Sequence, residues 1–166
     1  MSCIIIACTP RTGSNLLMLS LSQHHQAVCG GEWHSEDQYR CDPGHWENKK
    51  TNPDKVNLIK VFWPEPIPFD GMVVHLYRED IESQIASWER ASETGEWISG
   101  KSSEPTEMPA NARSIIAGSS YQADVHISYE WMVSHWEETI AMLLEMAGWE
   151  VIPLGMAIEK QGGTPK

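Results

Sequence analysis

The segment 9–17 combines the residue types that bind an anion. It reads Thr-Pro-Arg-Thr-Gly-Ser-Asn-Leu-Leu and follows the apolar run 3–8. A loop between a buried strand and a helix presents unpaired backbone N–H groups, and Gly13 lets an anion approach the backbone. The hydroxyls of Thr12 and Ser14 add donors, and Arg11 is the only cation before residue 34. The segment therefore predicts an anion site.

Two other interpretations of this loop were weighed against an anion site. A plain turn between a strand and a helix needs no ligand, and it stays an open alternative. A loop for a magnesium-bound nucleoside triphosphate ends in Gly-Lys-Ser/Thr, an ending that this sequence lacks. A hydrolase of ATP or GTP is therefore disfavoured.

Residues 24–45 hold the side-chain types that bind zinc, namely His24, His25, His34, His45, Cys29 and Cys41. A structural zinc site uses closely spaced pairs such as Cys-x-x-Cys or His-x-x-x-His, and neither occurs here. We therefore expect no metal. The favoured interpretation is that these histidines line a small-molecule pocket or lie on the surface.

Four apolar runs are typical of buried strands: 3–8, 57–62, 72–77 and 125–129. A short β-branched run without alternating polar residues indicates a strand that is covered on both faces of a parallel sheet. The helical patterns that lie between these runs favour an α/β fold, with a parallel sheet flanked by helices in three layers.

Three helices are expected between and after these strands. The first begins after Gly13. The second is capped by Asp80 and ended by Gly95. A capping box at 134–137, followed by an apolar stripe and then Gly148, predicts the third. The polar stretch 98–111 is expected to be a lid or binding loop.

Length and charge exclude several classes of protein. The chain has 166 residues, the size of a single domain spanning 1–166, and its net charge of −11 argues against nucleic acid or an anionic membrane as a partner. No apolar stretch reaches the roughly 20 residues of a membrane span. The first residues lack the pattern of a secretory signal, and the four cysteines show no disulfide framework. A cytoplasmic protein is expected.

Two segments in the same order resemble the sulfotransferases of the bacterial trehalose 2-sulfotransferase branch. The segment 9–17 is similar to their phosphosulfate-binding loop, which carries Arg where animal cytosolic enzymes carry Lys. The segment 75–97 resembles their Arg-x-Asp…Gln…Ser…Trp…Thr-Gly-x-Trp stretch. Two weaker matches are Lys60 with Trp63, and the Tyr-Glu pair at 129–130 that precedes the late helix.

The resemblance implies a sulfate donor, 3′-phosphoadenosine 5′-phosphosulfate (PAPS), and a P-loop-like fold. The residues implied to bind this donor are Arg11, Thr12, Gly13, Ser14, Asn15, Leu16, Arg78 and Ser87. In the family the first loop holds the phosphosulfate, whereas the arginine and serine that match Arg78 and Ser87 hold the 3′-phosphate. A guanidinium fork and a hydroxyl suit a dianionic phosphate. The alternative for Arg78 is a surface ion pair with a neighbouring carboxylate.

The resemblance also places two catalytic groups. Arg11 is expected to stabilise the leaving phosphate, and Glu32 to act as the base for the acceptor hydroxyl. The family's Gly-x-Pro-x-Glu stretch follows its second strand; here the stretch 30–33 lacks the proline and is one residue short. His34 and Glu36 are therefore alternative bases, and a solvated Glu32 without a catalytic role is a further alternative.

The acceptor site is predicted from fewer residues. Trp33, Trp88 and Trp97 flank the two motifs, and tryptophan rings offer flat apolar faces to a sugar or an adenine. His34 directly follows Trp33 in the sequence. By analogy with the family, Lys160 and Gly162 are assigned to a late segment over the 3′-phosphate.

The sequence therefore predicts a sulfotransferase that moves a sulfuryl group from PAPS to a hydroxyl of a small molecule, without a metal. The resemblance favours a carbohydrate acceptor over a lipid or another metabolite. The alternatives are a non-catalytic phosphoadenosine-nucleotide-binding protein and an ATP-dependent P-loop phosphotransferase. Exposed edges of a small sheet often pair, so a homodimer stays open.

Overall fold

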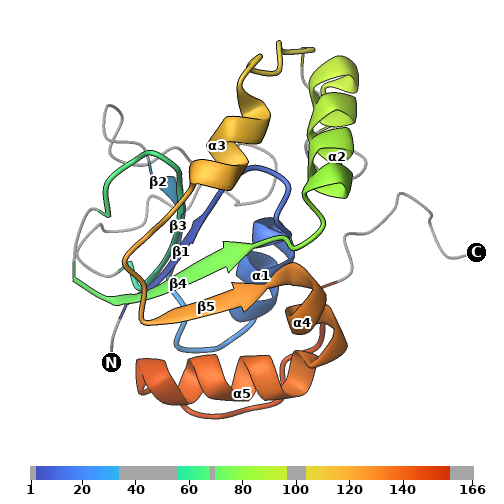
Figure 1. The fold of residues 1–166 in the computed structure, drawn as a ribbon. Coiled ribbons are helices and arrows are strands. Elements are labelled where there is room, and N and C mark those ends of the chain that lie inside the picture. Colours follow the sequence, from blue (N-terminus) through green and yellow to red (C-terminus); the bar gives the residue numbers. More distant parts are fainter. Residues whose placement is uncertain (1–2, 34–55, 68–69, 97–103, 158–166) are drawn as a thin grey trace, which may run out of the picture.

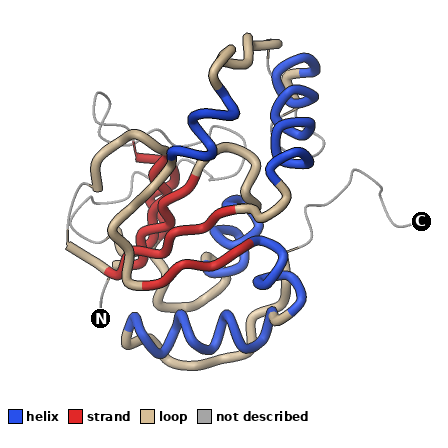
Figure 2. The backbone as a smooth tube through the Cα atoms, in the orientation of Figure 1, coloured by secondary structure: helices blue, strands red, loops and turns tan. Residues whose placement is uncertain are grey.

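Five parallel strands form a single sheet in the order β2-β3-β1-β4-β5. The computed structural model describes residues 3–33, 56–67, 70–96 and 104–157. The strands are β1 (Ile4–Cys8), β2 (Cys29–Trp33), β3 (Leu58–Phe62), β4 (Met72–Tyr77) and β5 (Val125–Ser128). Figure 2 shows these strands side by side, with helices on either side of them.

The helices complete a three-layer α/β arrangement, as the sequence predicts. They are α1 (Ser14–Leu21), α2 (Ile81–Thr94), α3 (Ala112–Gly118), α4 (Tyr129–Ser134) and α5 (Trp136–Ala147). The first, fourth and fifth helices pack on one face of the sheet, and α2 and α3 lie on the other side of it (Figure 1). Among the described helices, none combines the length and the apolar character that a membrane crossing requires.

The position of β1 in the centre of the sheet explains why its sequence is apolar throughout. Ile4 and Ile6 join the core beneath α1 and α5, whereas Ile5 and Ala7 join the core of the opposite face around Tyr121. All the residues of β1 are completely buried. A strand covered on both faces needs apolar side chains at odd and even positions alike, which gives the continuous run.

The caps of two helices follow the sequence signals. Asp80 Oδ1 accepts a hydrogen bond of 2.9 Å from the Ser83 backbone N–H at the start of α2. Gly95 ends α2 and Gly148 ends α5, at φ values of 69° and 68°. A left-handed residue directly after a helix favours glycine because it has no Cβ.

Three local predictions need correction. The expected capping box at 134–137 is wrong, because Ser134 already ends α4 and its hydroxyl donates to the carbonyls of Glu130 and Trp131. Tyr129 begins α4 and is not part of the fifth strand. Strand β2 extends to residue 33, so Glu32 lies within a strand and not in a loop after one.

The topology places a switch point beside β1. The chain leaves β1 toward β2 at one edge of the sheet, and it leaves β4 toward β5 at the other edge. Ligands of open parallel sheets bind where the connections of two neighbouring strands diverge in this way, at the carboxyl ends of the strands. The loop 9–13 follows β1 and Arg78 follows β4, so both lie at this point.

Candidate functional site

The loop between β1 and α1 packs tightly against the residue that follows β5. Gly13 has a φ of 84°, and a Cβ at this position would lie 2.4 Å from Cδ2 of Tyr129. Arg11 also has a positive φ, of 67°, which is uncommon for a residue with a side chain. Both the backbone conformation and the lack of space therefore require glycine at position 13. Gly13 caps α1 without a side-chain acceptor for the first turn.

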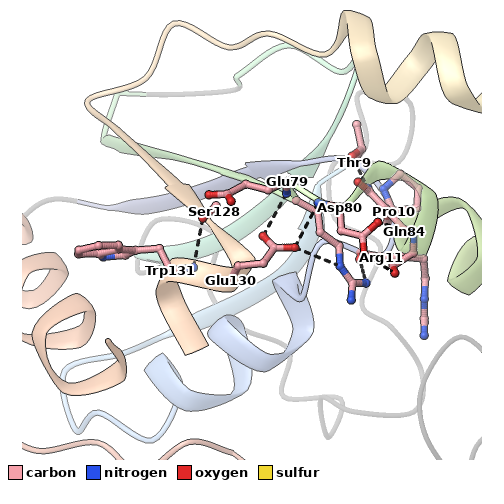
Figure 3. Close-up of polar contacts among 11 residues, drawn as sticks. Thr9, Pro10, Arg11, Glu79, Asp80, Gln84, Ser128, Glu130 and Trp131 are labelled. Carbon is pink, nitrogen blue, oxygen red and sulfur yellow. Dashed lines mark hydrogen bonds and ion pairs between the residues drawn. The ribbon is translucent and has the colours of Figure 1, made fainter. Parts of the chain in front are cut away.

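A buried glutamine holds the loop from within. Gln84 Nε2 of α2 donates to Thr9 Oγ1 at 2.9 Å and to the carbonyl of Pro10 at 2.6 Å (Figure 3). Gln84 is completely buried and Thr9 almost so. These two hydrogen bonds link the shape of the loop to the position of α2. Loss of a buried polar group from such a network costs about 1–3 kcal/mol.

Three of the residues expected to bind the donor come together. Arg11 Nε donates to Ser87 Oγ at 2.9 Å, although the two residues are 76 positions apart. Arg78 Nη1 donates to the Arg11 carbonyl at 3.4 Å, and the Arg78 guanidinium lies 4.8 Å from the centre of the Tyr129 ring. The loop after β1, the end of β4 and the middle of α2 thus meet at two guanidinium groups and one hydroxyl.

Glu130 organises the turn between β4 and α2. Its two carboxylate oxygens accept the backbone N–H groups of Glu79 and Asp80 at 3.0 and 3.3 Å (Figure 3). Oε1 also lies 3.7 Å from Arg78 Nε. Burial by itself would raise the pKa of Glu130, but these backbone hydrogen bonds and Arg78 hold the pKa below its usual value. Arg78 therefore also forms, with Glu130, the ion pair with a carboxylate that was the alternative expectation for this residue.

A second polar cluster lies on the other side of β1. Lys60 of β3 is only 3% exposed, and its Nζ lies 2.6 Å from Glu32 Oε1 of β2. The same ammonium donates to Asn15 Oδ1 of α1 at 2.6 Å. Glu32, the expected base, is 21% exposed. The expected base is thus ion-paired at the carboxyl end of the sheet and is not a solvated loop residue.

Several side chains of the loop face the interior. The Thr12 hydroxyl is completely buried and donates to the Thr9 carbonyl at 3.1 Å. Ser14 is buried beside Cys8, whose pKa burial raises to about 11. Leu16 packs against the core. The burial of the Thr12 and Ser14 hydroxyls therefore does not match the expectation that they donate to an anion. The loop offers its backbone to an anion instead.

Trp33 and Trp88, the two tryptophans expected at the acceptor site, differ in burial. Trp88 is only 6% exposed and packs in a small core with Ala112 and Ile116, so the expectation of a ring facing an acceptor does not match its burial. Trp33 is half-buried and packs on the face of the sheet opposite to α1. Since neighbouring residues of a strand point to opposite faces, Trp33 and Glu32 do not share one.

Some expectations fall outside the described residues: those for His34, Glu36, Cys41, His45, Trp97, Lys160 and Gly162. Among the described residues, no group of three or more possible metal ligands occurs. Both ring nitrogens of His24 are engaged, one with the Glu150 carbonyl at 2.8 Å and one with the Gln26 N–H at 3.1 Å. His24 therefore has a structural role, because it connects the backbone at residue 26 to the backbone at residue 150.

The sequence contained a signal for the Lys60 cluster that spacing alone did not resolve. Lys60 is the single charge in a strand whose other residues are apolar, and a charge in such a strand requires a partner. Gln84 is a comparable polar residue at a buried position of α2. The sequence does not say which partners they bind.

The chain was compared with models of known protein families, with curated proteins and with solved structures, and none of the three comparisons gives a match.

Proposed function

We propose that this protein is a PAPS-dependent sulfotransferase that transfers a sulfuryl group to a hydroxyl of a small acceptor, a carbohydrate by resemblance to the trehalose 2-sulfotransferase branch. The contact of Arg11 Nε with Ser87 Oγ at 2.9 Å carries the proposal. Arg11 belongs to the segment 9–17 of the resemblance and Ser87 to the segment 75–97. If either match were due to chance, there would be no reason for these two side chains to be in contact.

The residues present fit an anionic donor. Arg78 Nε is buried and has no hydrogen-bond acceptor among the described residues, since Glu130 Oε1 lies 3.7 Å away. An unsatisfied guanidinium nitrogen is costly unless an acceptor arrives, and a phosphate supplies several. Arg78 and Ser87 would hold the 3′-phosphate, and Arg11 with the backbone of the loop would hold the phosphosulfate.

The order of the strands separates the three tasks of such an enzyme. Arg78 follows β4, the loop 9–13 follows β1, and Glu32 lies on β2, three positions from β4 in the sheet. With neighbouring strands about 4.8 Å apart, these positions span roughly 14 Å along the carboxyl edge. The 3′-phosphate, the phosphosulfate and the acceptor would thus follow one another along the edge.

The chemistry assigned to the chain consists of charge stabilisation and one proton transfer. The bound donor supplies the sulfuryl group, whose S–O bond to the 5′-phosphate breaks as the acceptor oxygen bonds to sulfur. Arg11 stabilises the charge that develops on the leaving phosphate. Glu32 takes the proton of the acceptor hydroxyl. The loop and β2 fix the distance between these two groups, which favours an in-line geometry.

The location proposed for this function is the cytoplasm. Cys3 and Cys8 are free thiols. Free cysteines fit a reducing compartment.

A titration with adenosine 3′,5′-bisphosphate, AMP and magnesium-ATP tests the donor site. A ligand that binds the folded state raises the melting temperature, and the shift grows with the logarithm of the ratio of ligand concentration to Kd. We expect a large shift with the bisphosphate and a small one with AMP. A shift with magnesium-ATP alone would support an ATP-dependent phosphotransferase instead, and no shift with any ligand would refute the proposal.

Transfer is measured with sulfur-35-labelled PAPS and a panel of neutral sugars that includes trehalose and glucose. Labelled sugar that forms only in the presence of the protein supports the proposal. Binding of the bisphosphate without transfer to any member of a broad hydroxyl panel would favour the non-catalytic nucleotide-binding alternative.

A further inference from the structure

Lys60 links three elements of the fold through one buried ammonium group. It lies in register with Glu32 of β2 on one side and Ile6 of β1 on the other. Its Nζ lies 2.6 Å from Glu32 Oε1 and 2.6 Å from Asn15 Oδ1. Asn15 is the second residue of α1, directly after the loop expected to hold the phosphosulfate.

The fold does not require a lysine at this position. The rest of β3 is apolar, and Lys60 points to the same face as the core residue Leu58. Desolvation of an ammonium group costs several kcal/mol, and an apolar side chain of similar volume in place of a buried ion pair is often neutral or stabilising. A lysine that is 3% exposed therefore indicates a task other than stability.

We propose that Lys60 is a positioning residue for the Glu32 carboxylate in sulfuryl transfer. This inference rests on the proposed function. The ion pair holds the carboxylate, and the hydrogen bond to Asn15 fixes the ammonium to the first turn of α1, so the base keeps a constant position relative to the donor loop. Lys60 makes and breaks no covalent bond. The acceptor proton passes to Glu32 and not to Lys60.

The position of Glu32 explains why such a link is needed. Glu32 is carried by β2, an edge strand that pairs with β3 and has a register shift between Cys29 and Gly31. An edge strand with two glycines holds its side chains less firmly than the central strand does. A displacement of about 1 Å can cost roughly a hundredfold in rate, and the buried lysine restrains the Glu32 carboxylate against such a displacement.

The test is a double-mutant cycle in the transfer assay with labelled PAPS and trehalose, or the best acceptor of the sugar panel. The variants are Lys60→Met, Glu32→Gln and the double variant, with Lys60→Arg as the conservative change. We expect Lys60→Met to lower kcat about 10- to 100-fold, with the Kd for adenosine 3′,5′-bisphosphate within about twofold of wild type. Lys60→Arg should recover part of this loss.

The double variant distinguishes positioning from a structural role. If Lys60 acts through Glu32, the double variant should be no slower than Glu32→Gln alone, because the two losses are then not additive. It also removes both charges together, so it tests the inference even where Lys60→Met by itself folds poorly. The control is Arg113→Met, which removes one cation from the exposed Arg113–Glu82 pair between α3 and α2. This variant should retain the wild-type kcat.

The outcomes separate the inference from the function it rests on. Transfer by the wild-type protein together with an unchanged kcat in Lys60→Met would overturn the inference alone. The same conclusion would follow if the losses of Lys60→Met and Glu32→Gln multiplied in the double variant. Absence of transfer by the wild-type protein to any acceptor would overturn the proposed function, and the inference with it.

Discussion

Replacement of Arg78 by alanine removes the guanidinium proposed to bind the 3′-phosphate. Among the described residues, this guanidinium makes weak contacts, with the Arg11 carbonyl at 3.4 Å, the Tyr129 ring at 4.8 Å and Glu130 at 3.7 Å. Glu130 keeps its backbone hydrogen bonds from Glu79 and Asp80 when Arg78 is absent. The variant should therefore fold, and its far-UV circular dichroism should match that of the wild type.

The magnitude of the effect follows from the contacts that the guanidinium would exchange. A charge-assisted hydrogen bond contributes about 1.5–3 kcal/mol. Arg78 is 23% exposed and already has Glu130 nearby, and both features reduce the gain on binding a phosphate. We therefore expect the lower part of the range, about 1.5–2 kcal/mol, which corresponds to a Kd for adenosine 3′,5′-bisphosphate raised about 10- to 30-fold.

Isothermal titration calorimetry measures this change, with AMP as the matched ligand because it lacks the 3′-phosphate. The affinity for AMP should be the same in Arg78→Ala and wild type within about twofold, and Arg113→Ala should change neither affinity. A Kd for the bisphosphate within twofold of wild type would refute the assignment of Arg78. An equal loss for both ligands would show that Arg78 supports the site as a whole and does not recognise the 3′-phosphate.

Three further predictions concern other parts of the molecule. Glu32→Gln should lower kcat at least tenfold and leave the bisphosphate Kd unchanged; an unchanged kcat in the transfer assay would move the role of base to another residue. Gly13→Ala should lower the free energy of unfolding in urea by at least about 2 kcal/mol, because of its φ of 84° and because the new Cβ would clash with the Tyr129 ring; a smaller loss would show that the ring moves freely. Burial, and then the charge of His126, lower the pKa of His75 from 6.5, so protonation opposes folding and stability should fall as the pH decreases below 6.5. His75→Gln should flatten this decrease in pH-dependent urea unfolding, and equal slopes in the two proteins would contradict the argument.

The four strands that the sequence predicted well each follow a run of largely apolar residues. Strand β4 has the predicted bounds, Met72–Tyr77, and β1, β3 and β5 differ from their predicted ranges by one residue. Strand β2 escaped prediction because its first three residues, Cys29 to Gly31, offer one small side chain and two glycines. Neighbouring β3 defines this strand through its hydrogen bonds, and a local pattern contains no trace of such a neighbour.

The ends of the helices show the same distinction between local and distant causes. Asp80 and Gly95 act on backbone groups within a few residues, so both caps were readable. The capping box predicted at 134–137 was wrong because the Ser134 hydroxyl can either cap the helix that follows it or donate to carbonyls of the helix that precedes it. The second arrangement occurs because Ser134 ends the short helix α4, whose position depends on the end of β5.

The motifs of the candidate site are local in the sequence, whereas its contacts are not. The motifs selected Arg11, Ser87 and Arg78, and the fold brings these three together. Their mutual distances depend on strand order, which a sequence pattern does not contain. The ion pair of Glu32 with Lys60 joins two strands that are far apart in the chain, and burial of the lysine becomes visible only once β3 is placed between its neighbours.

The packing of Gly13 against Tyr129 has a consequence for the order of events during synthesis. The loop 9–13 is synthesised well before Gln84 and Tyr129, yet its shape depends on Gln84 and on the ring of Tyr129. At about 5–20 residues per second, Tyr129 follows the loop by several seconds or more. A nascent chain that ends before residue 129 therefore carries the whole motif without its proper conformation, and we expect binding of the proposed nucleotide to appear abruptly once Tyr129 has left the ribosome.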